Sequence, residues 1–293
     1  MTQLKEVDAD LLREMPLPHH PDDSDKEDRG RLFVIAGSRE LPGAALLAGV
    51  AALRAGAGKL QIATAESISV QLGIAVPEAR VIPHRETAED CVDESAIETI
   101  IEQTVKAQAV VIGCGLQHGP PLDRLLDALL DCGAGIPLVL DAAVLGSLAP
   151  RAEALKAWQG GAIVLPHAGE MARLLECEAD EVSADPEAAA RRAAERFNVV
   201  AVMKGQHSYI VAPDGRAFRF SGGGVGLATS GSGDSLAGIV GGLAARGTDP
   251  LVAAIWGIYL HGAAGRRLMN EVGRVGFLAR ELLDVVPKLM EGR

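Results

Sequence analysis

A glycine-rich stretch that ends in an aspartate is the part of the sequence with the clearest chemical meaning. Residues 222–234 are Gly-Gly-Gly-Val-Gly-Leu-Ala-Thr-Ser-Gly-Ser-Gly-Asp. Residues 231–234 lie at a predicted helix N-terminus, where unpaired amides and the helix dipole attract anions and glycine lets the backbone close around a phosphate. The helix is predicted from apolar residues spaced along one face, namely Leu236, Ile239, Val240 and Leu243.

The side chain of Asp234 has two interpretations at this position. Aspartate is a common N-cap, which is a purely structural role. A carboxylate beside a phosphate-binding loop can instead act as a general base that takes the proton from a hydroxyl attacking phosphorus. We favour the general base because glycines surround this aspartate.

Two familiar phosphate-binding motifs are absent from the sequence. There is no G-x-x-x-x-G-K-[ST], and no G-x-G-x-x-G follows the first predicted strand, where a dinucleotide-binding fold would place it. The glycine loop late in the chain is therefore the predicted phosphate site, and an ordinary nicotinamide-dependent oxidoreductase is disfavoured.

The elements that position this loop alternate between apolar strands and amphipathic helices. Strands without alternating polarity are typical of a parallel sheet covered on both faces, so we predict an α/β fold with a single doubly wound, mostly parallel sheet and helices on both faces. Pro213-Asp214-Gly215 predicts the turn of a β-hairpin. The expected strands are 32–36, 60–63, 109–112, 138–140, 162–165, 199–203, 208–211 and 216–220, and the expected helices are 44–55, 122–130, 168–175 and about 186–197, with three more from Ser235, Pro250 and about Leu278.

Small and polar residues follow most of the predicted strands. Ligands of an open parallel sheet bind beyond the carboxyl ends of its strands, so these segments are candidate site residues. A structural role is open for several: Ala44 and Ala45 as small residues of a packed helix, Gly115 as the end of a strand, and Asp141 as a cap. The segments are Gly37-Ser38, Pro42-Gly43-Ala44-Ala45, Gly113-Cys114-Gly115-Leu116, Asp141, Pro166-His167-Ala168-Gly169-Glu170 and Lys204-Gly205.

Three charged or ionisable residues in these segments carry the same ambiguity. His167 fits a capped loop histidine, and Lys204 fits a surface lysine as well as a ligand of phosphate. Glu170 stands three residues after His167, but one such pair is weak evidence for a metal site.

Composition and charge exclude several other classes of protein. The chain of 293 residues has 28 Lys and Arg against 39 Asp and Glu, giving a net charge of −11, which argues against binding to nucleic acid. No apolar run is long enough for a membrane span, and the acidic N-terminus does not resemble a secretory signal, so we expect a cytoplasmic protein. Four cysteines without a C-x-x-C pair predict reduced thiols.

Residues 1–30 are expected to form a solvated acidic arm, with a short helix near 10–15, before one domain over 31–293.

Taken together, these segments resemble the ribokinase-like superfamily, and within it the ADP- or ATP-dependent NAD(P)H-hydrate dehydratases. The Gly-Ser-Gly-Asp sequence that ends at Asp234 is moderately specific alone, and the Pro-His-x-Gly-Glu sequence of residues 166–170 makes the resemblance specific. Further segments in the family's order are Gly37-Ser38 with Pro42-Gly43-Ala44-Ala45, Gly113-Cys114-Gly115-Leu116, Lys204-Gly205-Gln206-His207-Ser208 and Ala263-Ala264-Gly265.

The resemblance implies repair of damaged nicotinamide cofactors. Such an enzyme acts on the S-epimers of NADHX and NADPHX, in which water has added across a ring double bond and left a hydroxyl on C6. It phosphorylates that hydroxyl from ADP or ATP, with Mg²⁺, and loss of phosphate restores the double bond. The alternatives are a superfamily kinase of a small sugar or vitamin alcohol, disfavoured by residues 166–170, and a catalytically silent nucleotide-binding regulator, disfavoured by the intact Asp234.

The resemblance also implies roles for individual residues. Asp234 would be the base, and the amides of Gly231, Ser232, Gly233 and Asp234 would stabilise the charge of the transferring phosphoryl group. Glu170 would be an outer-sphere magnesium residue. The remaining expected assignments are Ala44, Ala45, Gly115 and His167, with Asp234, for the hydrate, and Lys204, Gly205, Gln206, His207, Ser208 and Gly233 for the nucleotide.

The sequence departs from the family's pattern at several positions. The family usually has proline where Cys114 stands, threonine where Leu165 stands, asparagine where Gly224 stands and glycine where Ser230 stands. None of these positions is Asp234 or His167. The resemblance further implies a homotetramer and an epimerase partner on a separate chain, because the epimerase domain fused in some relatives has no room in this sequence.

Overall fold

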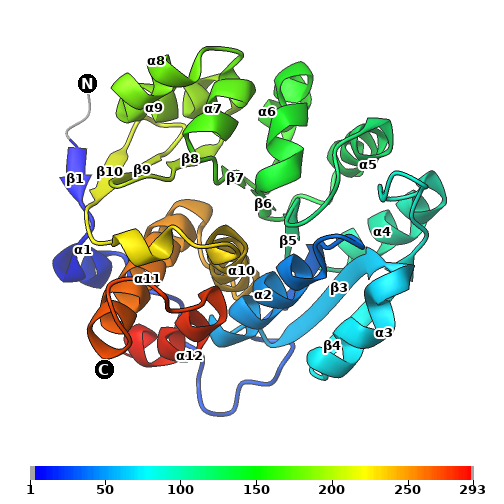
Figure 1. Ribbon diagram of the computed structural model, residues 1–293, viewed down its shortest axis with the longest axis horizontal. Coiled ribbons are helices and arrows are strands. Elements are labelled where there is room, and N and C mark those ends of the chain that lie inside the picture. The colour runs from blue at the N-terminus through cyan, green and yellow to red at the C-terminus, as the bar shows by residue number, and fades with distance from the viewer. Residues whose placement is uncertain (1–3, 292–293) are drawn as a thin grey trace.

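A ten-stranded sheet runs through the centre of the protein, described by a computed structural model over residues 4–291 (Figure 1). The strands are β1 Leu4–Glu6, β2 Arg31–Ile35, β3 Lys59–Ala65, β4 Ala79–His84, β5 Ala109–Ile112, β6 Leu138–Leu140, β7 Ala162–Val164, β8 Val200–Met203, β9 Ser208–Val211 and β10 Ala217–Phe220. They are three to seven residues long, from β1, β6 and β7 to β3.

Helices connect these strands and cover the sheet. The longer ones begin where the sequence provides a helix start, such as Pro186 after Asp185 and Pro250 after Asp249, whose carboxylates accept hydrogen bonds from the first turn. The α-helices are α1 Ala9–Glu14, α2 Pro42–Arg54, α3 Glu66–Ala75, α4 Ile97–Thr104, α5 Pro120–Asp131, α6 Ala152–Ala157, α7 Ala168–Leu175, α8 Ala179–Ala184, α9 Pro186–Phe197, α10 Ser232–Ala245, α11 Pro250–Glu271 and α12 Ala279–Met290. Short 3-10 helices lie at Glu94–Ala96, Ala142–Ser147, Ala149–Arg151 and Val225–Leu227.

The strand order is β1-β10-β9-β8-β7-β6-β5-β2-β3-β4, and it confirms the predicted mostly parallel α/β sheet. Only β9 runs antiparallel to its neighbours β8 and β10, as the predicted hairpin requires. The order turns between β5 and β2, so the chain winds outward in both directions from this point. Ligand sites of open sheets form where the order reverses, which places the expected site beyond the carboxyl ends of the central strands.

Successive residues of the central strands point to opposite faces of the sheet. Leu32 and Val34 of β2 pack on one face, in a core with α1, α2, α3, α10, α11 and α12, while Phe33 and Ile35 pack on the other with α4 to α9. Figure 1 shows α2, α10, α11 and α12 grouped side by side. Helices therefore cover both faces, as the unbroken apolar strands predict.

The prediction of a solvated arm over residues 1–30 needs correction for the residues 4–15. β1 adds a parallel strand to β10, and the N-cap Asp8 accepts hydrogen bonds that start α1, which buries Leu11 and Leu12. Burial of these leucines outweighs the acidic character of the segment, so it joins the fold. Residues 16–29 contain no buried residue, and residues 1–3 lie outside the described part of the chain.

Candidate active site

The start of α10 has the geometry of an anion site. Gly231 is the N-cap, with φ of +85°, and a Cβ there would come within 2.4 Å of Leu47 Cδ1, so only glycine fits. No side chain caps this helix start. The amide of Ser232 donates to Thr229 O at 3.2 Å, whereas helix geometry leaves the amides of Gly233 and Asp234 without an intrahelical partner. The expected contribution of the Ser232 amide is therefore wrong, and the amides of Gly233 and Asp234 are the donors available to a phosphoryl group.

Asp234 lies in the first turn of α10, three residues after the N-cap Gly231. The interpretation of this aspartate as the N-cap is therefore wrong. Burial raises the pKa of its carboxyl, and the Cys114 thiol and Lys204 oppose that rise. A raised pKa makes the carboxylate a better proton acceptor, as a general base requires.

Four strand ends converge in front of α10. Cys114 follows β5, Asp141 follows β6 directly, Glu170 lies in the first turn of α7 after β7, and Lys204 follows β8. Lys204 Nζ is 2.8 Å from Asp141 Oδ1 and 3.8 Å from Glu170 Oε2. Lys204 is thus bound to two carboxylates beside the helix start, and its interpretation as a surface lysine is wrong.

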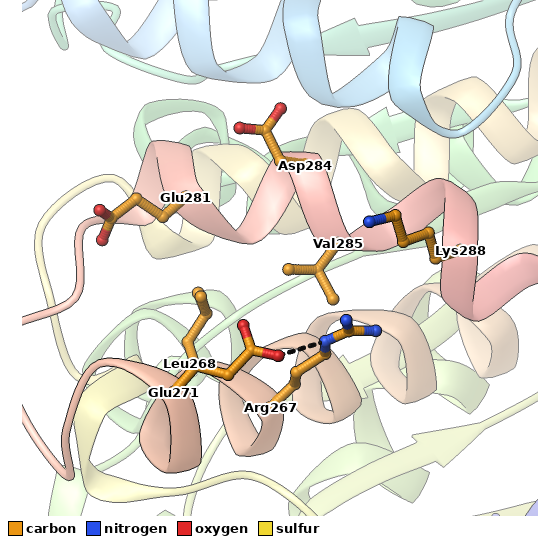
Figure 2. A pocket seen from close by; sticks show the side chains of 7 residues that line it. All are labelled: Arg267, Leu268, Glu271, Glu281, Asp284, Val285 and Lys288. Atoms are coloured by element: carbon orange, nitrogen blue, oxygen red, sulfur yellow. Dashed lines mark hydrogen bonds and ion pairs between the residues drawn. The ribbon is translucent and has the colours of Figure 1, made fainter. Parts of the chain in front are cut away.

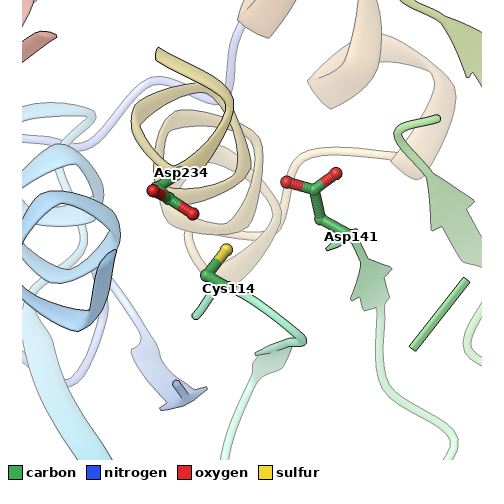
Figure 3. A group of neighbouring side chains, drawn as sticks. All are labelled: Cys114, Asp141 and Asp234. Atoms are coloured by element: carbon green, nitrogen blue, oxygen red, sulfur yellow. The ribbon is translucent and has the colours of Figure 1, made fainter. Parts of the chain in front are cut away.

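Asp141, Asp234 and Cys114 form one group (Figure 3). A carboxylate oxygen of each aspartate and Cys114 Sγ all lie within 4.8 Å of one another. Figure 3 shows Asp234 projecting from α10 and Asp141 from the end of β6 toward the Cys114 thiol between them. Burial, followed by the two nearby carboxylates, raises the pKa of this thiol well above its usual range, so Cys114 is a neutral thiol.

The charges in this group depend on one another. Burial raises the pKa of Asp141 to about 6, although Lys204 counteracts it. Burial also works against the ammonium of Lys204, but Asp141 and Glu170 outweigh it and raise the Lys204 pKa. Three carboxylates and one ammonium leave a net negative charge, which a bound cation would offset.

The chemistry of this donor set fits magnesium, the metal that the resemblance implies. Magnesium prefers oxygen ligands and retains several of its waters, so carboxylates can hold it without direct contact from every residue. Asp141, Glu170 and Asp234 offer carboxylate oxygens at the same helix start, whereas a neutral thiol such as Cys114 is a poor magnesium ligand.

His167 is the N-cap of α7 and part of a capping box. Its Nδ1 accepts hydrogen bonds from the amides of Gly169 at 3.1 Å and Glu170 at 3.4 Å, and Glu170 Oε2 accepts from the His167 amide at 2.8 Å. The capped-histidine interpretation is therefore confirmed. Its side chain is 57% exposed, so the ring stays open to a substrate.

The small residues near α2 are required by close packing. A Cβ at Gly115, whose φ is +65°, would come within 2.6 Å of Ala44 Cβ, and one at Gly37 would come within 2.9 Å of Ala45 Cβ. Ala45 is fully buried. The structure thus brings the loops after β2 and β5 together at the start of α2, with packing as the role of the Ala45 side chain.

The nucleotide segment expected over residues 204–208 divides into two parts. Lys204 points to the carboxylates, and a Cβ at Gly233 would be 3.6 Å from its Nζ. Gly205, Gln206 and His207 are exposed in the loop before β9. Their exposure leaves this loop free to contact a nucleotide beside the half-buried Lys204.

A pocket elsewhere in the molecule contains none of the expected site residues. It lies between α11 and α12 and has a volume of about 250 Å³ (Figure 2). Figure 2 shows Arg267 and Glu271 paired with each other. Their Nε and Oε1 atoms are 2.8 Å apart, and Asp284 pairs with Arg54. Its charges are largely satisfied within the protein, so the helix start of α10 remains the candidate active site.

Comparison with known proteins agrees with this geometry. The model of the family described as NAD(P)H-hydrate dehydratase matches residues 32–288. The chain belongs to this family. An ADP-dependent (S)-NAD(P)H-hydrate dehydratase of Xanthomonas campestris is 42% identical over 291 residues, which cover 99% of this chain and 97% of that protein. One of Bacillus subtilis is 33% identical, with 93% of each chain covered.

Solved structures of the dehydratase family and of more distant proteins share the fold. The ADP/ATP-dependent NAD(P)H-hydrate dehydratase of Bacillus subtilis, co-crystallised with ATP and Mg²⁺, has a TM-score of 0.84 at 29% identity and covers 100% of this chain and 99% of its own. Pyridoxal kinase of Staphylococcus aureus has a TM-score of 0.56 at 15% identity, a likeness of fold alone. The fold confirms the expected ribokinase-like architecture.

Three residues at this dehydratase-family site were missed or left without a role by the sequence. The position of Asp141 directly after a predicted strand identifies it as a candidate, but the sequence assigns it no catalytic or binding role. Cys114 was noted only as a departure from the family. His261 had no distinguishing pattern, because it lies inside the apolar helix α11, and it contacts Ser232 at the start of α10.

No helix among residues 4–291 is long and apolar enough to cross a membrane.

Proposed function

We propose that this protein restores NADH and NADPH from the S-epimers of NADHX and NADPHX, with ADP or ATP as phosphoryl donor. The observation that carries the proposal is the half-buried carboxylate of Asp234 beside two unpaired amides of α10. The family match over residues 32–288 and the names of the relatives support the substrate class.

Proton removal is the first step that the geometry supports. Asp234 takes the proton of the C6 hydroxyl, and the oxygen attacks the terminal phosphorus of the nucleotide. Burial has raised the pKa of Asp234, so it holds this proton more readily than an exposed aspartate would. The amides of Gly233 and Asp234 donate to the phosphoryl oxygens as their charge is redistributed.

Loss of phosphate then restores the ring. Phosphate is a far better leaving group than hydroxide, so the C6–O bond breaks with the electron pair passing to phosphate. The neighbouring ring carbon gives up a proton to water, and the electron pair of that C–H bond forms the double bond. Lys204, held between Asp141 and Glu170, places a positive charge beside Gly233, where it can neutralise phosphate oxygens. Glu170 and Asp141 would hold Mg²⁺, which supplies further neutralisation of phosphate charge when bound.

The proposal also covers the residues that contact the two substrates, the oligomeric state, the location and the partner of the enzyme. The exposed ring of His167 and the loop containing Gly115 would contact the hydrate, with Ala44 and Ala45 shaping the loop, while residues 204–208 and Gly233 would contact the nucleotide. A homotetramer, a cytoplasmic location and a separate epimerase that supplies the S-epimer belong to the same proposal. The bifunctional NAD(P)H-hydrate repair enzyme of Escherichia coli is 32% identical to this chain. The aligned region covers 99% of this chain but only 53% of that protein.

Recovery of reduced-nicotinamide absorbance tests this function. Purified protein with Mg²⁺ is mixed with NADHX or NADPHX, in parallel reactions with ADP, with ATP and without nucleotide. We expect recovery only with a nucleotide, and the more effective nucleotide identifies the donor. Failure of every reaction, while ADP still binds, would overturn the proposal in favour of an alcohol kinase.

A further inference from the structure

His261 of α11 contacts the start of α10 through one nitrogen atom. Its Nε2 lies 2.9 Å from Ser232 Oγ and 3.1 Å from the backbone oxygen of the same serine. Ser232 is the first residue of α10 and is 5% exposed. The contact joins two residues 29 positions apart in the chain. It lies at the start of α10, where the phosphoryl group is expected.

The chemistry of these contacts fixes the proton on the His261 ring. A carbonyl oxygen only accepts hydrogen bonds, so an Nε2 atom 3.1 Å from Ser232 O carries a hydrogen and donates it. Burial lowers the pKa of His261 to about 4, so the ring is neutral near pH 7 and has this single N–H.

The hydroxyl of Ser232 is then an acceptor from His261, and its own hydrogen is left over. Because Nε2 already carries its hydrogen, Ser232 Oγ cannot donate to that atom. Within residues 4–291, the structure gives Ser232 Oγ no other partner. The amide of Ser232 is occupied by Thr229, so the side chain is the group through which this serine can bind an anion.

We propose that His261 is a positioning residue that holds the Ser232 hydroxyl so that it donates its hydrogen to the transferring phosphoryl group. This inference rests on phosphoryl transfer at the start of α10, the first half of the proposed function. Ser232 would be a third donor beside the amides of Gly233 and Asp234. Charge on the phosphoryl oxygens is redistributed most strongly in the transition state, so this donor affects turnover more than nucleotide affinity.

Two substitutions at each position separate the hydrogen bond from packing. His261→Leu removes the donor with a side chain of similar bulk, and His261→Gln supplies an amide N–H in its place. Ser232→Ala removes the hydroxyl, and Ser232→Thr retains it. His84→Leu is the matched control, because His84 is also buried but its Nε2 has no partner.

We expect His261→Leu and Ser232→Ala each to lower kcat roughly 10- to 100-fold, the loss expected for one hydrogen bond to a charged group, with the Kd for ADP changed less than about threefold. The double variant should be no slower than the slower single variant, because both remove the same interaction. His261→Gln and Ser232→Thr should recover most of the activity, and His84→Leu should match the unsubstituted protein.

A second readout does not depend on the nicotinamide substrate. Aluminium fluoride with Mg²⁺ imitates a phosphoryl group in transfer when it is bound beside the nucleotide that the donor leaves behind, which is AMP for the donor ADP and ADP for the donor ATP. The affinity for this complex, relative to the same nucleotide alone, should fall in His261→Leu and Ser232→Ala by a factor similar to the loss in kcat. A Ser232→Ala protein with unchanged kcat and unchanged aluminium fluoride affinity would overturn the inference, as would fully additive losses in the double variant. If the unsubstituted protein fails on NADHX but shows the aluminium fluoride effect, only the proposed substrate is wrong.

Discussion

Replacement of the Asp234 carboxylate by an amide tests the proposed base with little disturbance of the fold. Asp234→Asn keeps the shape of the side chain and an oxygen that can accept from the Cys114 thiol. Burial disfavours the ionised carboxyl, so removal of its charge should leave the free energy of unfolding unchanged or slightly higher. A loss of activity in this variant therefore cannot come from unfolding.

The expected loss follows from the chemistry of the step. A positioned general base contributes about 10²- to 10⁴-fold to a rate, so kcat should fall by that factor, equivalent to about 3 to 5 kcal/mol in the activation barrier. ADP affinity, measured by calorimetry, should stay within about threefold, because the amides of Gly233 and Asp234 remain in place.

A second aspartate provides the control for this variant. Asp284 is 74% exposed on α12 and paired with Arg54, and Asp284→Asn should retain full kcat. The assay is initial-rate recovery of reduced nicotinamide at saturating NADHX and ADP. An Asp234→Asn enzyme with kcat within about fivefold of the unsubstituted protein would refute the role of Asp234 as base.

Three further predictions concern the groups around Asp234. Lys204→Met leaves the Asp141 and Glu170 carboxylates unpaired and should lower the free energy of unfolding by about 3 kcal/mol in urea titrations, whereas Lys156→Met, on the surface, should lower it by less than about 1 kcal/mol. The folded-state pKa of Asp141, about 6 against 3.8, means that the folded chain binds its proton more tightly; stability should therefore fall as pH rises through this interval, and Asp141→Asn should flatten that fall. Loss of the thiol donor in Cys114→Ala should raise the Asp234 pKa and move the acidic limb of the kcat/KM profile to higher pH, and Cys114→Ser should restore it; an unmoved limb in Cys114→Ala would contradict the thiol contact.

The central strands and the start of α10 were predictable because their patterns have direct physical causes. A strand buried on both faces must be apolar, as residues 32–35 of β2 and all of β5 and β8 are, and such runs stand out in the sequence. The glycine with positive φ at position 231 precedes a helix of regular apolar spacing, so the loop and the helix could be identified together.

The edges of the sheet could not be predicted in the same way. β1 is three residues long and contains Lys5 and Glu6, both exposed, and β4 contains Pro83, so neither has the continuous apolar run of a central strand. Both are strands because a neighbouring strand offers backbone hydrogen bonds to them. This is a property of the folded sheet rather than of either segment.

The residues of the candidate site also fall into two groups: those with a local sequence pattern and those whose role depends on contacts in the folded protein. Asp234 and His167 have local sequence patterns, and the structure finds both at helix starts. The functions of Lys204 and Asp141 depend on their contact across 63 positions of the chain, which spacing cannot reveal. The contact of His261 with Ser232 spans 29 positions and also depends on tertiary structure, namely the packing of α11 on α10.

The central claim is that the C6 hydroxyl of the hydrate is phosphorylated before it leaves. Oxygen-18 placed in that hydroxyl tests this claim most directly, by mass spectrometry of the inorganic phosphate after turnover with ADP or ATP. The C6 oxygen becomes the bridging atom to phosphorus and departs with it, so we predict one labelled oxygen in each phosphate released. Label that appears in water, with unlabelled phosphate, would contradict the claim.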